Sequence, residues 1–307
     1  MSKASNKLFT STLTAMCAVF VALFGLTTSV SAAQPPVNLG TAAPFAILAG
    51  TVNITDVAPL SRITGNVGLS PATGADIGLV CSQVTGTIYS VDAAGPLPCR
   101  VTDGPLLVTA KNNLTSAYTD AAGRTPVTTV PTELGGTTLV AGVYDSASTR
   151  LGITAGAGPL VLDGQNDSSS VFIFQAAFSG TGLTIGDGSA ISLINGAQAC
   201  NVFWRVDTAS IGTTANFAGT ILALNSITVA NGATIEGRLL ARNGSVTLIN
   251  DTITAPTCVN NTALTRVPGL PNTGSSSSQH VLGVVVASAS LLSVLALTYV
   301  ARKKYLS

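Results

Sequence analysis

Few residues of this sequence are suited to catalysis or metal binding. The 307 residues include one histidine, one tryptophan and two methionines, and only 9% are charged. Histidine is the commonest metal ligand and the usual proton carrier near neutral pH, so its scarcity argues against metal centres and acid–base catalysis. The sequence also contains no GxSxG, P-loop or HExxH motif. We therefore predict that the protein is not an enzyme and needs no cofactor or metal.

Positive charge is scarce in the central part of the chain. All 13 acidic residues lie between Asp56 and Asp251, whereas five of the 14 basic residues lie at the two ends. Nucleic-acid binding requires a basic surface, and the central part has a single lysine, Lys111, so we exclude nucleic acid as a partner. A polysaccharide lyase or hydrolase would need clustered carboxylates. The closest pair, Asp163 and Asp167, lies in a turn-like sequence, which disfavours that alternative.

The amino-terminal segment has the features of a secretory signal peptide. Residues 1–33 begin with Lys3 and Lys7, continue with a short apolar run, and end with small residues at Ala32 and Ala33. This pattern predicts cleavage after one of the two alanines. The alternative is an amino-terminal membrane helix.

A sorting signal is predicted at the carboxyl end. An apolar stretch at residues 281–300 is about 30 Å long as a helix, enough for a C-terminal transmembrane helix, and a basic tail follows it. An LPxTG pentapeptide precedes it and consists of Leu270, Pro271, Asn272, Thr273 and Gly274. This order resembles the cell-wall sorting signal of Gram-positive surface proteins. The resemblance implies that a sortase cleaves after Thr273 and joins it to peptidoglycan; a plain membrane anchor is the alternative. Either way, we expect display outside the cell.

The cysteines fit an oxidising compartment. Loss of the signal peptide removes Cys17 and leaves Cys81, Cys99, Cys200 and Cys258. Four cysteines allow three pairings, and we favour Cys81–Cys99 and Cys200–Cys258. The first would close a short loop and stabilise the protein by roughly 3 kcal/mol on the loop-entropy model.

Residues 34–258 form the predicted domain, and residues 259–269 form a linker to the sorting signal. GTILA at 219–223 recurs as GRLLA at 237–241, an offset of 18, and Phe203 lies 18 residues before Ile221. A period of 18 to 19 residues with short strands and tight turns predicts an all-β fold, a three-sided parallel β-helix. Asn-Gly pairs at 195–196, 231–232 and 243–244 supply turns, since both residue types tolerate positive φ.

One segment has helical rather than strand periodicity. Apolar residues recur at helical spacing from Pro105 to Tyr118, after Asp103, a residue type that caps helices. We predict one amphipathic helix over about 104–121, packed along an apolar flank of the solenoid.

Motifs along the domain resemble the microbial ice-binding protein family. In chain order they are VNLGTA at 37–42, FAILA at 45–49, ITGNVGLSP at 63–71, AGRTP at 122–126, VFIFQ at 171–175, GAQA at 196–199, VFW at 202–204 and GRLLA at 237–241. The resemblance implies an irregular right-handed parallel β-helix with one long α-helix alongside. It also implies that the amino-terminal coil is inserted between later coils, which would explain why residues 45–49 resemble residues 237–241.

The resemblance further implies binding to ice through a flat face of small uncharged residues. Alternation predicts that Ile227, Val229, Val246 and Leu248 point inward, so their neighbours point outward. The predicted ice-binding residues are Asn53, Thr55, Thr184, Ser210, Ser226, Thr228, Ser245 and Thr247. An alternative face would use Thr234 and Thr214. We expect a secreted, wall-anchored ice-binding protein whose partners are ice, sortase, peptidoglycan and, before sorting, the membrane. The alternative is a wall-anchored adhesin or structural β-helix without ice activity.

Overall fold

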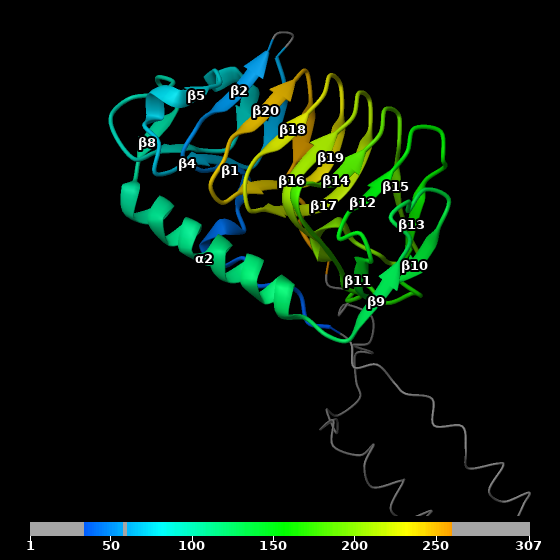
Figure 1. Cartoon of the computed structure of the whole chain (residues 1–307). Helices are drawn as coiled ribbons and strands as arrows, with labels where there is room; N and C mark the ends of the chain where they lie inside the picture. The colour runs from blue at the N-terminus through cyan, green and yellow to red at the C-terminus, as the bar shows by residue number, and fades with distance from the viewer. Residues whose placement is uncertain (1–33, 58–59, 260–307) are drawn as a thin grey trace, which may run out of the picture. The chain divides into compact units, whose positions relative to one another are not determined.

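The described part of the protein is a stack of coils built from short parallel strands (Figure 1). The computed structural model describes residues 34–57 and 60–259. Every ladder between named strands is parallel, as the β-helix prediction requires. The predicted all-β fold is therefore confirmed, while the handedness of the coil stays a prediction.

The strands form three faces. The first, which we call the helix-covered face, contains β9 (Val127–Val130), β11 (Gly142–Ser146), the first part of β14 (Phe172–Ile185), the first part of β16 (Val202–Ile211), the second part of β17 (Asn216–Ala223), the second part of β19 (Thr234–Ala241), β1 (Phe45–Ala49), β4 (Asn66–Leu69), β7 (Ile88–Ser90) and β8 (Arg100–Thr102).

The second, which we call the hydroxyl face, contains β12 (Leu151–Ile153), the second parts of β14 and β16, β18 (Ile227–Val229), β20 (Val246–Ile249), β2 (Ile54–Val57) and β5 (Ile77–Gly78). The third face contains β10 (Thr138–Val140), β13 (Leu160–Asp163), β15 (Ile191–Ile194), the first parts of β17 and β19, β21 (Thr252–Thr254), β3 (Arg62–Thr64) and β6 (Val84–Thr85). Short 3-10 turns are η1 (Gly40–Ala42), η2 (Gly74–Asp76), η3 (Cys81–Gln83) and η4 (Ala199–Asn201).

The amino-terminal coil lies inside the stack. Strand β1 pairs with β19 on one side and β4 on the other, β2 lies between β20 and β5, and β3 lies between β21 and β6. Figure 1 shows the blue strand β2 beside the orange strand β20. Ile47 is opposite Leu239 and Leu48 is opposite Leu240. The expected insertion is thus confirmed, and it accounts for the likeness between residues 45–49 and 237–241.

The 18-residue offset is confirmed between β17 and β19 and between β16 and β18, and it is wrong between β16 and β17. Gly219 to Ala223 are opposite Gly237 to Ala241 at an offset of 18. Phe203, however, is opposite Thr220, and Trp204 is opposite Ile221. The offset there is 17, so alternation directs Trp204 into the solenoid core and Phe203 outward against the helix.

Stacked aromatic rings fill one end of the core. The ring centroids of Tyr144 and Phe174 are 5.5 Å apart, and those of Phe174 and Trp204 are 3.9 Å apart and nearly parallel. Phe217 follows at 5.6 Å from Trp204. The Trp204 indole N–H donates to the Ala218 carbonyl at 3.0 Å, so the buried polar atom is satisfied. Consecutive coils are thereby held in a fixed register.

Helix α2 (Gly104–Gly123) runs along the helix-covered face, as the sequence predicted (Figure 1). The Asp103 carboxylate caps it by accepting a hydrogen bond from the Leu106 N–H at 2.9 Å. Its buried side, which includes Leu107 and Leu114, packs against outward residues of several strands, among them Phe203. The helix carries the chain from β8 at one end of the stack to β9 at the other.

Both predicted disulfides are present. Cys81 is bonded to Cys99 and Cys200 to Cys258, each with a Cα–Cα distance of 5.5 Å. Among residues 34–57 and 60–259, no helix is long and apolar enough to cross a membrane. The predicted signal peptide, LPxTG motif and membrane span all lie outside these described residues.

Glycine is used for two different physical reasons at the Asn-Gly turns, positive φ at one and a close contact between coils at another. At Asn195-Gly196 both residues have positive φ, 49° and 86°, as predicted. At Asn243-Gly244 the chain also bends, as predicted, but neither residue has positive φ, so the predicted reason was wrong there. Glycine is needed at 244 because a Cβ would lie 2.2 Å from the Ser226 hydroxyl oxygen on the neighbouring coil.

Candidate functional site

Five outward hydroxyl residues of the hydroxyl face form one continuous row. On successive neighbouring strands, the residues that lie opposite one another are Thr184, Ser210, Thr228, Thr247 and Thr55. Neighbouring strands are about 4.8 Å apart, so the row is a regular ladder. The five residues were all predicted from the sequence as one surface, and the structure brings them together.

A second row runs beside the first, two residues earlier in the chain, or three at Thr181, where the register shifts. It contains the predicted residues Ser226, Ser245 and Asn53, whose carbonyls accept from the N–H groups of Ala209, Ile227 and Val246 on adjacent strands. Sequence analysis missed Thr208 and Thr181, which are opposite each other at the end of this row. Alternation was the available signal for Thr208, because it lies two residues before Ser210.

Hydrogen bonds between hydroxyls fix the side chains within each row. Thr55 Oγ1 donates to Thr247 Oγ1 at 3.3 Å in the first row. Ser245 Oγ donates to Ser226 Oγ at 3.3 Å in the second. The surface is rigid because the residues between the outward ones are fully buried, as predicted for Ile227, Val229, Val246 and Leu248.

Both ends of the first row lack side chains. Gly152 is opposite Thr184 at one end, and Gly78 is opposite Thr55 at the other. Neither the first row nor the second contains a charged residue. The two rows therefore form a bounded, uncharged lattice.

A cavity marks the edge of this lattice beyond Thr184. It has a volume of about 660 Å³ and is lined by hydroxyl residues, Gly152, Glu133 and Arg150. Burial raises the pKa of Glu133, but hydrogen bonds from Thr154 and from the Gly135 N–H outweigh it and lower the pKa below its usual value. The Glu133 carboxylate thus lies at the border of the row, in the cavity that Thr184 also lines.

The third face is also rich in threonine but carries charge. One of its rows contains Asn216, Thr234, Thr252 and Arg62, and the next contains Ala218, Glu236, Thr254, Thr64 and Thr85. The alternative face predicted from Thr234 and Thr214 is not assembled, because Thr214 lies in a turn with a φ of 55° rather than in a strand.

A buried carboxyl group holds the corner between the hydroxyl face and the third face. Asp251 is 1% exposed and accepts hydrogen bonds from the N–H groups of Ala233 and Ile249, both at 2.9 Å. Its own N–H donates to Ser61 Oγ at 2.8 Å. Burial raises the pKa of Asp251 to about 6, and the nearby Asp56 adds to the rise. The sequence offered no signal that this carboxyl group is buried.

The acidic residues considered for sugar chemistry are used in turns. Asp163 accepts from the Gln165 N–H and the Asn195 side chain, and Asp167 accepts from the Ser169 N–H and hydroxyl. Among the described residues, no group of three or more histidine, cysteine or acidic side chains is placed to hold a metal ion. The hydroxyl face is the surface best organised for binding.

Comparisons with known proteins agree on one family. Residues 47–254 match the family described as Ice-binding-like. A protein of Flavobacterium frigoris named "Ice-binding protein" is 44% identical over 224 residues, covering 72% of this chain and 76% of that protein. A protein of the same name from Colwellia sp. is 44% identical over 234 residues, covering 75% of this chain and 88% of that protein.

Solved structures agree with the sequence relatives. An ice-binding protein from an Antarctic biological consortium matches with a TM-score of 0.62 and 36% identity, covering 74% of this chain and 94% of that one. An ice-binding protein from an Arctic yeast matches with a TM-score of 0.63 and 30% identity, covering 75% and 98%. With more than half of its residues matched and relatives of this identity, the chain belongs to the ice-binding-like family.

Proposed function

We propose that the protein adsorbs to ice through the hydroxyl face. The observation that carries this proposal is the continuous row of Thr184, Ser210, Thr228, Thr247 and Thr55, in register on adjacent strands. Ordered water can be held by hydroxyl and methyl groups at a fixed spacing, and charges would impose hydration shells of their own. The relatives named as ice-binding proteins support the same function.

The mechanism follows from rigidity and regular spacing. Water on this face meets oxygen atoms repeated about every 4.8 Å along the stack, with the threonine methyl groups between them. Because the strands are parallel and their inward residues are fully buried, the lattice does not reorganise on contact with ice. Little conformational entropy is then lost on adsorption.

The direct test is activity of the soluble domain. We expect residues 34–269, expressed alone, to shape ice crystals, to produce thermal hysteresis, and to inhibit recrystallisation at micromolar concentration. Unshaped crystals and no inhibition would contradict ice binding and favour the alternative, an adhesin or structural β-helix without ice activity.

We further propose that the protein is secreted and anchored to the cell wall. This proposal rests on the sequence of residues 1–33 and on the LPxTG motif followed by an apolar span. Thr273→Ala should move the protein from the wall fraction to the membrane or the medium. If the variant stays in the wall fraction, sortase processing at this residue is wrong.

A further inference from the structure

The carboxyl end of the domain does not continue the coil. After β21, the position beside β19 on the helix-covered face is already taken by β1. Residues 255–259, which we call the terminal strap, instead turn along the corner between the third face and the helix-covered face. The Ala255 N–H still donates to the Thr64 carbonyl at 2.9 Å, so the strap begins within the stack.

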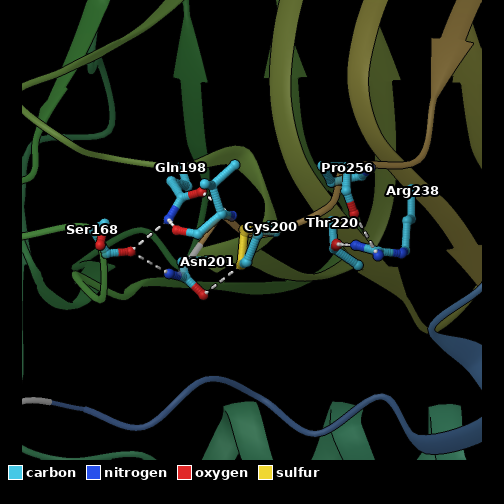
Figure 2. The surroundings of a disulfide bond; sticks show 9 residues. Ser168, Gln198, Cys200, Asn201, Thr220, Arg238 and Pro256 are labelled. Atoms are coloured by element: carbon cyan, nitrogen blue, oxygen red, sulfur yellow. Dashed lines mark hydrogen bonds between the residues drawn. A yellow bond between two sulfur atoms is a disulfide. The ribbon is translucent and has the colours of Figure 1, made fainter. Parts of the chain in front are cut away.

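The strap is then fastened to one coil after another. Arg238 of β19 donates through Nη2 to the Pro256 carbonyl at 2.9 Å and through Nη1 to Thr220 Oγ1 of β17 at 3.3 Å (Figure 2). Cys258 is bonded to Cys200, beside the start of β16. The attachment therefore passes over the coils of β19 and β17 before it reaches a covalent link.

A side-chain clasp holds the last described residue. Gln198 accepts from the Val259 N–H at 2.7 Å and donates to the Val259 carbonyl at 3.1 Å. The same amide nitrogen donates to the Ser168 carbonyl at 2.8 Å, and Asn201 donates to that carbonyl at 3.1 Å. Figure 2 shows Ser168, Gln198 and Asn201 grouped beside the disulfide. The clasp thus connects the end of the strap to the coil that precedes β14.

The disulfide closes a covalent loop around much of the hydroxyl face. Its cysteines are 58 positions apart, so the loop encloses residues 201–257. These residues include Ser210, Thr228 and Thr247 of the first row, and the strands from β16 to β21. When tension is applied to the chain beyond Val259, the disulfide transmits it to Cys258 and Cys200 together. Strand β21 therefore cannot be peeled from its neighbours one hydrogen bond at a time.

We propose that the terminal strap is a mechanical attachment, which transmits tension on the carboxyl end through Cys258 and Cys200 to the coil of β16. This inference rests on the proposed wall anchoring, because an anchored protein that holds a partner such as ice experiences such tension. The strap makes no hydrogen bond with the two hydroxyl rows. It therefore protects the ice-binding strands without taking part in ice binding.

The experiment is single-molecule pulling of the mature full chain between handles at its two ends. In the oxidised protein, residues 201–257 stay closed, so full unfolding extends the chain by about 200 Å less than in a variant without this disulfide. The Cys200→Ser/Cys258→Ser variant should also show a new early rupture at lower force, when β21 and then β20 are peeled away.

The matched control is Cys81→Ser/Cys99→Ser, which removes a disulfide outside the path of the load. It should leave the first rupture force unchanged, although its loop also contributes to stability. If Cys200→Ser/Cys258→Ser does not fold, folded Cys81→Ser/Cys99→Ser protein can be reduced and pulled at once. The same first rupture force with and without the Cys200–Cys258 bond would overturn the proposal, as would an equal drop in the control.

Failure of this inference is distinguishable from failure of the proposed function. Thermal hysteresis of the Cys200→Ser/Cys258→Ser variant free in solution should equal that of the wild type, because the strap does not contribute to the hydroxyl face. Loss of hysteresis in this variant would instead mean that the disulfide shapes the face, and would overturn a purely mechanical role. Absence of hysteresis in the wild type would contradict ice binding and leave the pulling result intact.

Discussion

The hydroxyl face and the third face are built from the same coils and have outward threonines in common, yet they differ in continuity and charge. The ladder of the hydroxyl face runs unbroken from β12 to β5. The third face is divided, because among the described residues β10, β13 and β15 form a separate three-stranded sheet, and an isolated bridge from Ala190 to Asn216 takes the place of a continuous ladder to β17. It also carries Arg62 and Glu236 in its rows. Threonine content alone therefore does not identify a binding surface; continuity and neutrality separate the two.

The strongest test of this comparison places the same bulky side chain on each face. We expect Thr228→Tyr or Thr247→Tyr to abolish thermal hysteresis, because a ring would hold the flat row away from ice. Both residues are outward, so the free energy of unfolding should change by no more than about 0.5 kcal/mol. Thr252→Tyr on the third face is the control and should keep full hysteresis. Activity lost only in the control would move the site to the third face.

The corner between the two faces should make stability depend on pH. The pKa of Asp251 is about 6 in the folded protein, above the usual carboxyl value of 3.8, so the folded state binds this proton more tightly than the unfolded state. Its contribution is fully present below pH 3.8 and is lost as pH rises through 6. The loss amounts to at most about 3 kcal/mol.

Urea unfolding from pH 4 to pH 7 measures this effect. Asp251→Asn cannot lose a proton, so the difference in unfolding free energy between wild type and variant should shrink as pH rises. The comparison with the variant is needed because Asp92 and Asp167 have lowered pKa values, from hydrogen bonds that act in the opposite direction. A difference that is constant across this range would show that Asp251 is already ionised at pH 4.

A smaller effect should come from removing charge on the third face. In the Thr228→Tyr background, Arg62→Thr with Glu236→Thr makes the rows of that face neutral. We expect a weak recovery of ice shaping, well below wild-type hysteresis, because the division between β15 and β17 remains. Recovery to the wild-type level would show that charge alone separates the faces, and no recovery would assign the difference to continuity.

The smallest effect should come from lengthening the first row by one hydroxyl. Gly78 is exposed at its end, and a Cβ there would lie 3.0 Å from the Ile54 carbonyl oxygen, a contact that a small shift relieves. Gly78→Thr should raise hysteresis slightly and cost less than about 1 kcal/mol. Gly152→Thr is the contrasting variant. Its Cβ would lie 2.6 Å from the Thr184 carbonyl oxygen, so this substitution should lower the melting temperature. Equal melting temperatures would contradict this difference.

Local patterns in the sequence were enough to predict much of the molecule. Asp103 and the apolar spacing after it located helix α2, and alternation around Thr228 and Thr247 located the first row. These features depend on neighbours along the chain. The two disulfides were also predicted correctly, since four cysteines in the domain leave only three possible pairings.

Features that depend on contacts between coils were harder to predict. The offset between β16 and β17 is one residue shorter than the repeat suggested, so Phe203 lies opposite Thr220 and not opposite Ile221. The Asp251 N–H donates to Ser61 Oγ, 190 positions away in sequence, and no local pattern records that contact. The position of the amino-terminal coil was predicted from the family resemblance and not from periodicity, because pairing between strands that are distant in sequence leaves little trace in the local sequence.

The inserted amino-terminal coil sets the order in which the chain can fold. The hydroxyls of Thr55 and Thr247 meet across 192 positions, and Lys111 of α2 donates to the carbonyls of Ala49 and Ala241 on neighbouring strands. A ribosome must therefore complete β19 to β21 before the first coil to be synthesised gains its second neighbour. Contacts this distant in sequence slow folding, because loop-closure entropy is lost before they form. The first strands synthesised are thus among the last to be enclosed, and a nascent chain presents their open edges throughout translation.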